Sequence, residues 1–175
     1  MAIGCKYVSF RRKPESSVFS KRSATWMPDQ VRHDERALDS QVMAHIDKEL
    51  LMTKAHNIRL LALDVDGVLT DGSIVYTSQG EQVQGFHVHD GLGLKLLGLA
   101  GIHVAILSSR SSRALTIRAE ELGIKLVYQG LPDKIEVYER IKKNLGIEDK
   151  EVACIGDDWV DLPLLQKAGL AIVVA

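Results

Sequence analysis

From residue 58 onward, short apolar runs alternate with longer segments whose apolar residues recur every three or four positions. The short runs predict buried strands, and the three-to-four spacing predicts amphipathic helices. Strands are expected at 58–64, 102–107, 125–128, 151–155 and 170–174. Helices are expected at 37–56, 90–100, 111–122 and 133–145, with a short helix after residue 158. This alternation indicates right-handed β-α-β units, and therefore an α/β fold with a doubly wound parallel sheet of the Rossmann type.

One segment interrupts the alternation between the first strand and the next helix. Residues 73–77 and 82–89 are rich in β-branched and aromatic residues, and they flank the glycine-containing turn 78–81. This pattern predicts a small β-hairpin. Because it follows the first strand directly, the hairpin is expected to act as a flap over the end of that strand.

The first 35 residues differ in composition from the rest of the chain. The first 27 residues contain six lysines and arginines but a single acidic residue, Glu15, and no hydrophobic period persists. A basic, serine-rich and acid-poor start also occurs in transit peptides. We favour a disordered or non-native extension over residues 1–35, followed by one folded domain over residues 36–175.

The overall composition is that of a globular domain. Hydrophobic residues make up 46% of the chain, charged residues 26%, and the formal net charge is −1. The near-neutral charge gives no support for a nucleic-acid or anionic membrane partner, and no apolar run is long enough to span a bilayer. The two cysteines, Cys5 and Cys154, form neither a disulfide framework nor a zinc motif, so a reducing cytoplasmic location is expected.

Polar residues with chemical potential follow several of the predicted strands. In a parallel sheet the carboxyl ends of the strands meet at one edge, where active sites collect. Two close carboxylates repel each other unless a cation or a proton lies between them, and an oxygen-rich set suits Mg²⁺. An ordinary strand followed by an Asp-Gly turn is the alternative for the first pair. The residues are Asp64 and Asp66 after the first strand, Ser108 after the second, Lys134 at the fourth helix, and Asp157, Asp158 and Asp161 after the fourth strand.

These groups favour phosphoryl chemistry. A metal beside a lysine and a serine hydroxyl makes a pocket for a phosphate dianion. One carboxylate near the metal can attack phosphorus and form an aspartyl-phosphate. A second carboxylate can protonate the leaving alcohol and then deprotonate the hydrolytic water.

The residues Asp64-Val65-Asp66-Gly67-Val68-Leu69-Thr70-Asp71, Ser108, Lys134 and Gly156-Asp157-Asp158-Trp159-Val160-Asp161 occur in that order. Over about residues 50–175 the chain thereby resembles the phosphatases of the haloacid dehalogenase superfamily.

The resemblance implies a role for each motif. Asp64 would be the nucleophile and Asp66 the general acid and base. Mg²⁺ would be held by the Asp64 carboxylate, the Asp66 backbone carbonyl and Asp157. Ser108 and Lys134 would hold the transferring phosphoryl group. Asp158 and Asp161 would lie behind the metal ligands, or would steady the loop or cap a helix.

Further motifs narrow the resemblance to the family of 3-deoxy-D-manno-octulosonate 8-phosphate (KDO 8-phosphate) phosphatases. They are the hairpin, the segment 86–93 and Tyr128-Gln129-Gly130 before Lys134. The family implies a haloacid dehalogenase-like fold without a large cap domain. It also implies a homotetramer with packed hairpins, and release of phosphate from a sugar acid in lipopolysaccharide precursor synthesis. A nine-carbon sialic-acid-type 9-phosphate phosphatase and an inactive assembly module are the alternatives.

Two features depart from that family. His89 stands where many relatives carry an arginine that would pair with the anionic substrate, and a neutral histidine would do so only weakly. His89 is therefore either a substrate-binding residue or a residue of the flap, and Arg110 is a further candidate for the substrate's anionic groups. The family's C-terminal tail, which reaches a neighbouring site, is also expected to be missing, which puts closure of the site in question.

Overall fold

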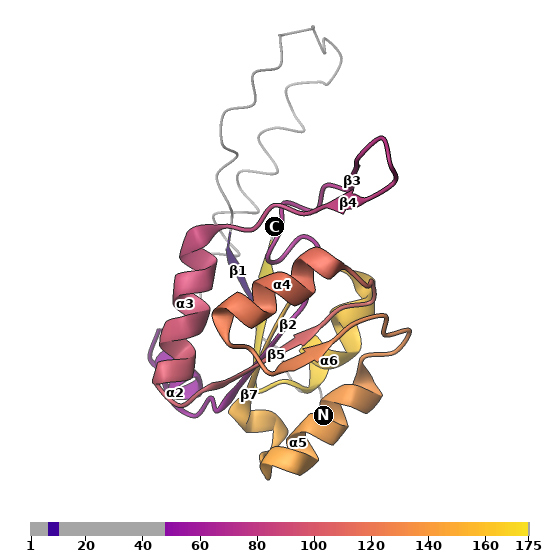
Figure 1. Cartoon of the computed structure of the whole chain (residues 1–175). Helices are drawn as coiled ribbons and strands as arrows, with labels where there is room; N and C mark the ends of the chain where they lie inside the picture. The colour runs from indigo at the N-terminus through magenta and orange to yellow at the C-terminus, as the bar shows by residue number, and fades with distance from the viewer. Residues whose placement is uncertain (1–6, 11–47, 175) are drawn as a thin grey trace, which may run out of the picture.

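The computed structural model describes residues 7–10 and 48–174, which form a sheet between two layers of helices and a separate hairpin (Figure 1). The strands are β1 (Tyr7–Phe10), β2 (Leu60–Leu63), β3 (Val75–Tyr76), β4 (Gln82–Val83), β5 (His103–Leu107), β6 (Leu126–Tyr128), β7 (Val152–Gly156) and β8 (Leu170–Val174). The helices are α2 (Lys48–His56), α3 (Val88–Leu99), α4 (Arg113–Leu122), α5 (Ile135–Leu145) and α6 (Leu162–Lys167), with 3₁₀ turns η2 (Asp149–Glu151) and η3 (Trp159–Asp161).

The six strands of the main sheet are all parallel and run in the order β1-β8-β7-β2-β5-β6. β2 lies between β5 and β7, with Leu63 opposite Ile106 on one side and Ile155 on the other. The chain proceeds from β2 to β5 on one side and returns later to β7 on the other. The crevice at the end of β2 is therefore the point where the strand order reverses, which is where α/β sheets bind ligands.

Alternate residues of β2 face two separate hydrophobic cores. Leu60 and Ala62 pack in the core that α5 and α6 cover, whereas Leu61 and Leu63 pack in the core under α3 and α4. Figure 1 shows these two pairs of helices on opposite sides of the sheet. Because both faces are covered, all four β2 residues are buried, which explains the continuous apolar run that predicted this strand.

The parallel α/β architecture predicted from the sequence is confirmed, and the boundaries of the main-sheet strands and of α3, α4 and α5 differ from the predicted ones by at most two residues. The hairpin is present, but its paired strands are shorter than predicted, only Val75–Tyr76 and Gln82–Val83. The first predicted helix is present as α2, and its earlier part, residues 37–47, lies outside the described residues. None of the described helices is long and apolar enough to cross a membrane.

The start of α3 differs from the prediction. The sequence predicts that Asp90 caps this helix, but the helix begins at Val88 and His87 is the capping residue. The His87 side chain accepts a hydrogen bond from the backbone N–H of His89, with 3.2 Å between the two nitrogen atoms. An imidazole nitrogen thus satisfies one of the free backbone donors of the first helical turn. The prediction favoured Asp90 because aspartate is a common residue at this capping position.

Within residues 1–35, for which the sequence predicts a disordered or non-native extension, the structure describes Tyr7–Phe10. These residues form β1, which pairs in parallel with β8 in a register that sets Tyr7 opposite Ala171. Without β1, strand β8 would be the edge of the sheet and would present unpaired backbone groups, which favour the addition of another strand. The other residues of this stretch lie outside the described residues.

Burial under α5 gives a test of the fold. Ile141 is 2% exposed, whereas Ile117 on α4 is 49% exposed. We expect Ile141→Ala to lower the free energy of unfolding by about 2–5 kcal/mol, because it leaves a cavity in a packed core. The matched change Ile117→Ala should alter it by less than about 0.5 kcal/mol. Denaturant unfolding of both variants measures this, and equal losses would contradict the described core.

Candidate active site

Asp64 comes directly after β2, at the carboxyl edge of the sheet, and is buried. Its backbone N–H donates to the carbonyl of Ile155 at 3.1 Å, which continues the pairing with β7 for one more residue. A tight turn follows, in which the amides of Val68, Leu69 and Thr70 all donate to the carbonyl of Val65. The turn therefore fixes the loop that follows Asp64.

Three carboxylates converge beside this loop. One oxygen from each of Asp64, Asp157 and Asp161 lies within 4.8 Å of the other two. Two glycines make room for them. A Cβ atom at Gly67 would lie 1.8 Å from an Asp157 oxygen, and one at Gly156 would lie 2.5 Å from the Asp161 Cβ. Gly67 also has φ +82°, which a residue with a side chain rarely adopts.

Lys134 supplies a positive charge to this group. Its side chain is buried, and its Nζ lies 3.0 Å from Asp64 Oδ1 and 2.7 Å from Asp161 Oδ1. Burial lowers the pKa of the Lys134 amine, but the hydrogen bond to Asp161 and the charge of Asp64 outweigh it, so its pKa is raised overall. Lys134 is therefore an ammonium ion that bridges two carboxylates.

The pKa values of two members of the acidic cluster, Asp64 and Asp157, differ from that of a free aspartate. Burial raises the pKa of the Asp64 carboxyl and the charge of Asp161 adds to this effect, although Lys134 opposes it. Burial also raises the pKa of Asp157, and the neighbouring charges of Asp161 and Asp158 raise it further. Burial is thus the main cause of both raised pKa values, the neighbouring carboxylates add to it, and the Lys134 ammonium offsets only part of it.

The position of Lys134 depends on the loop after β6. In that loop the Gly130 amide donates to the carbonyl of Arg110, and the Leu131 amide donates to the carbonyl of Ser108. The Asp133 side chain then accepts from the backbone N–H of Ile135 at 2.8 Å, which starts α5 beside Lys134. The loop after β5 and the loop before α5 are therefore held together.

Asp158 and Asp161 organise the loop after β7. Asp158 caps η3 by accepting from the backbone N–H of Trp159 at 2.6 Å. The second oxygen of Asp161 accepts from the amides of Asp157 and Asp158 at 3.3 and 3.4 Å. Asp161 also belongs to the acidic cluster, so it connects Lys134 to the loop that carries Asp157.

The side chain of Asp66 makes contacts different from those of Asp64. Residues two apart on a strand would point the same way, but the turn that begins at Val65 ends the strand before Asp66. Asp66 Oδ1 accepts a hydrogen bond from Gln84 Nε2 at 3.0 Å, and its Oδ2 lies 3.7 Å from Arg110 Nε. The acidic cluster therefore joins Asp64 to Asp157 and Asp161 rather than to Asp66.

Ser108 and Arg110 lie beside the same edge. Ser108 follows β5, the neighbour of β2, and is 3% exposed. Its hydroxyl accepts from the backbone N–H of Arg110 at 3.2 Å. Arg110 is half-buried, and its guanidinium donates to Gln82 Oε1 at 3.3 Å in addition to its contact with Asp66.

His89 does not lie on a hairpin strand as predicted. It is an exposed residue in the first turn of α3, and its ring packs edge-on against His87 with 4.9 Å between the centroids. Its described side-chain contact is with His87. The structure thus brings eight of the nine predicted site residues to one edge of the sheet, whereas His89 stands apart from them.

Sequence reasoning missed Gln82 and Gln84. Both lie on the returning arm of the hairpin, and each contacts a predicted site residue. Glutamines on a short strand carry no sequence signal of such a role. Only the fold of the hairpin over the loop after β2 could identify them.

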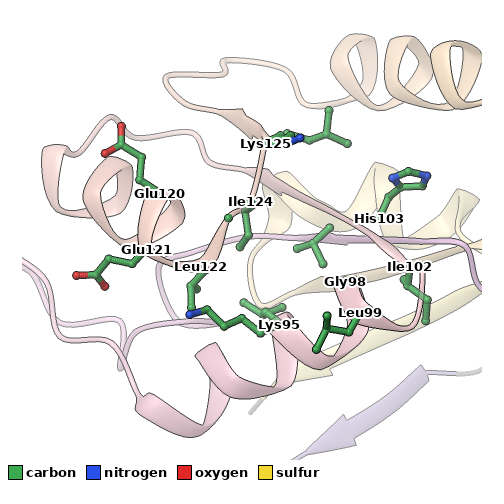
Figure 2. A pocket seen from close by; sticks show the side chains of 15 residues that line it. Lys95, Gly98, Leu99, Ile102, His103, Glu120, Glu121, Leu122, Ile124 and Lys125 are labelled. Carbon is green, nitrogen blue, oxygen red and sulfur yellow. The ribbon is translucent and has the colours of Figure 1, made fainter.

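A pocket of about 670 Å³ lies elsewhere, at the amino ends of β5 and β6 (Figure 2). Its lining includes Lys95 and Leu99 of α3, Ile102 and His103 at the start of β5, and Ile124 before β6. No residue of the acidic cluster lines this pocket. The chemistry that the carboxylates support therefore belongs to the opposite edge of the sheet.

Comparison with known proteins agrees with this geometry. A model of the haloacid dehalogenase-like hydrolases matches residues 126–175. The 3-deoxy-D-manno-octulosonate 8-phosphate phosphatase KdsC of Salmonella typhi is 42% identical over 125 residues, which cover 71% of this chain and 66% of that protein. The chain thus spans just under two thirds of that relative.

Solved structures give the same result. The phosphatase of that name from Yersinia pestis has a TM-score of 0.71 at 42% identity, covering 72% of this chain and 68% of that one. The chain belongs to the haloacid dehalogenase-like hydrolase family. The Moraxella catarrhalis 3-deoxy-D-manno-octulosonate 8-phosphate phosphatase, solved in complex with magnesium ion, phosphate ion and KDO molecule, has a TM-score of 0.70 at 44% identity. It covers 74% of this chain and 73% of that one.

The acidic cluster of this protein suits a hard divalent cation. Its donors are carboxylate oxygens from two neighbouring strand ends, which is the ligand type that Mg²⁺ takes. Three carboxylates face one ammonium ion, so a bound cation would relieve the remaining repulsion. Asp64 and Asp157 are the two carboxylates left to hold it, because Lys134 and backbone amides engage both oxygens of Asp161.

The raised pKa values of Asp64 and Asp157 predict how a cation affects stability. A carboxyl whose pKa is higher in the folded than in the unfolded state lowers the free energy of unfolding as pH rises. In the metal-free protein this loss of stability begins near the ordinary aspartate pKa and is complete above the raised pKa. We therefore expect Mg²⁺ to raise the thermal midpoint more at pH 7.5 than at pH 5, as measured by calorimetry.

Asp157→Asn provides the control for that measurement. It should raise the midpoint of the metal-free protein, because it removes one repelling charge, and should reduce the increase that Mg²⁺ causes. An increase of equal size at both pH values, or one unchanged in Asp157→Asn, would count against the site.

Proposed function

We propose that the protein is a Mg²⁺-dependent phosphomonoester hydrolase that works through an aspartyl-phosphate. The observation that carries this proposal is the buried Asp64 carboxylate, whose Oδ1 lies 3.0 Å from the Lys134 ammonium at the edge of the acidic cluster. Such a carboxylate is held in one orientation beside a cation-binding group, as a nucleophile toward a phosphate dianion must be.

In the first step an oxygen of Asp64 attacks phosphorus, and the bond between phosphorus and the leaving oxygen breaks. Asp66 gives its proton to that oxygen, so the alcohol leaves neutral. The contacts of Asp66 with Gln84 and Arg110 support this role, since they hold its carboxyl group beside the loop of Asp64.

In the second step Asp66, now ionised, takes a proton from water. The resulting oxygen attacks the phosphorus of the aspartyl-phosphate, and the bond to Asp64 breaks. Phosphate is released, and both aspartates return to their starting states.

Ser108 and Lys134 are proposed to hold the transferring group. The Lys134 ammonium can follow the negative charge from Asp64 to the equatorial phosphoryl oxygens, and the Ser108 hydroxyl can donate to one of them. Mg²⁺ held by Asp64, Asp157 and the backbone carbonyl of Asp66 would neutralise the phosphate charge.

The proposed substrate is 3-deoxy-D-manno-octulosonate 8-phosphate, and the reaction would serve lipopolysaccharide precursor synthesis. The relatives that are about 42% identical and carry this substrate in their names support the proposal. Arg110 is the proposed partner of the sugar acid's anionic groups, since it is half-buried beside Asp66. His89 is a weaker candidate for the same task, because it is exposed and packs on His87.

A homotetramer with packed hairpins is proposed as the working assembly. Four apolar side chains on the hairpin are about half exposed or more, as an interface between copies requires. They are Ile74 (54%), Val75 (50%), Tyr76 (60%) and Val83 (49%). A cytoplasmic location is also proposed, and the free, buried thiol of Cys154 supports it.

Asp64→Asn tests the proposed chemistry. The amide cannot attack phosphorus, so phosphate release from KDO 8-phosphate in the presence of Mg²⁺ should fall at least about 1000-fold. Asp71→Asn is the control, because Asp71 is exposed in the same loop and an asparagine oxygen can still accept from the Ser73 amide. Phosphate release by Asp71→Asn should stay within about threefold of the wild type.

The same assay separates the alternatives. Turnover that survives in Asp64→Asn would exclude Asp64 as the nucleophile. A wild-type protein inactive on both KDO 8-phosphate and 4-nitrophenyl phosphate would point to the assembly module. A higher kcat/KM on a nine-carbon sugar acid 9-phosphate would reassign the substrate.

Val75→Lys tests the assembly. A charge at an apolar contact between hairpins should break the tetramer, so the mass measured by light scattering during gel filtration should fall. Ile117→Lys, on the exposed face of α4, is the control and should leave the mass unchanged. A mass of one chain for the wild type would contradict the proposed tetramer.

A further inference from the structure

Gln84 contacts the proposed general acid but lies 18 residues away from it, on the arm of the hairpin that follows β4. Its Nε2 donates to Asp66 Oδ1 at 3.0 Å. The other oxygen, Oδ2, is 3.7 Å from Arg110 Nε, beyond hydrogen-bond distance. Of the two carboxylate oxygens, Oδ2 is therefore the one left to carry and give up a proton.

The amide of Gln84 can face Asp66 in only one way. With the group reversed, Oε1 would face a carboxylate oxygen, and two acceptors would repel each other. In the observed orientation Oε1 is buried and, within the described part of the chain, has no hydrogen-bond partner. A buried acceptor without a partner costs free energy, so this glutamine is a poor choice for stability alone.

Gln82 supports the same arrangement. It lies two residues earlier on the extended arm, so its side chain falls on the same face as that of Gln84. Its Oε1 accepts from Arg110 Nη2 at 3.3 Å. The hairpin thus contacts Asp66 directly through Gln84 and indirectly through Gln82 and Arg110.

We propose that Gln84 is a positioning residue that holds Oδ1 of Asp66 so that Oδ2 faces the leaving oxygen. The inference rests on the proposed function, since it assigns Gln84 to the acid step of that reaction. It makes the hairpin part of the catalytic apparatus and not only a cover or an interface. Its effect should appear wherever the leaving group needs a proton.

Two phosphate esters separate this role from a structural one. The alcohol of KDO 8-phosphate is a poor leaving group that needs a proton, whereas 4-nitrophenolate leaves without one. The parameter kcat/KM reports the steps up to departure of the alcohol. In Gln84→Met, which keeps the length but removes the amide, we expect kcat/KM to fall about 10–100-fold on KDO 8-phosphate and less than about threefold on 4-nitrophenyl phosphate.

Stability provides the second readout. Gln84→Met removes the unpartnered oxygen together with the donor, so its thermal midpoint should equal or exceed that of the wild type. Gln79→Met, at the exposed turn of the same hairpin, is the control. It should change neither kcat/KM on either ester nor the thermal midpoint. Equal losses on both esters, or a loss that accompanies a lower midpoint, would overturn the proposal.

A measurement without turnover keeps the two proposals distinguishable. In ¹⁵N NMR spectra the side-chain amide signals of Gln84 should shift in Asp66→Ala but not in Asp71→Ala. If they do not shift in Asp66→Ala, the contact is absent and the inference about Gln84 fails. If the wild type hydrolyses neither ester, the proposed function fails, whatever the spectra show.

Discussion

The imbalance between three carboxylates and one ammonium ion is the constraint on which the functional edge of this protein depends. Oxygens of Asp64, Asp157 and Asp161 come within 4.8 Å of one another, and among the described residues Lys134 is the cation that bridges two of them. Burial strengthens both the attraction and the repulsion, because little water screens them. Three carboxylates and one ammonium ion leave the cluster with an excess of negative charge, which a bound divalent cation would offset.

The fold delivers these groups by simple means. β2 is flanked by β5 and β7, so the loops after all three strands open at one edge. Gly67 and Gly156 lack the Cβ atoms that would collide with Asp157 and Asp161. The loop after β6 is tied to Ser108, and this tie brings α5 and its first residues toward the same edge. Two packed cores then keep the strands in register.

The sequence was sufficient for the sheet and for most of the acidic cluster. The strands β2, β5, β6, β7 and β8 are short apolar runs, helical periodicity separates most of them, and parallel strands necessarily bring their ends together. It was insufficient where distant segments decide the outcome. β1 forms by pairing with the edge of β8, and no local pattern in Tyr7–Phe10 predicts that pairing. Likewise, the turn after Val65 and the hairpin residue Gln84 determine where the Asp66 side chain lies.

The central claim is that Asp64 and Asp157 share a divalent cation, with Asp161 and Lys134 holding the arrangement in place. The most direct test is an anomalous diffraction experiment on crystals soaked in Mn²⁺ as a stand-in for Mg²⁺. The account predicts one strong peak within bonding distance of a carboxylate oxygen of both Asp64 and Asp157, and none in crystals of Asp157→Asn. The absence of a peak at this cluster, or a peak coordinated by neither residue, would contradict it.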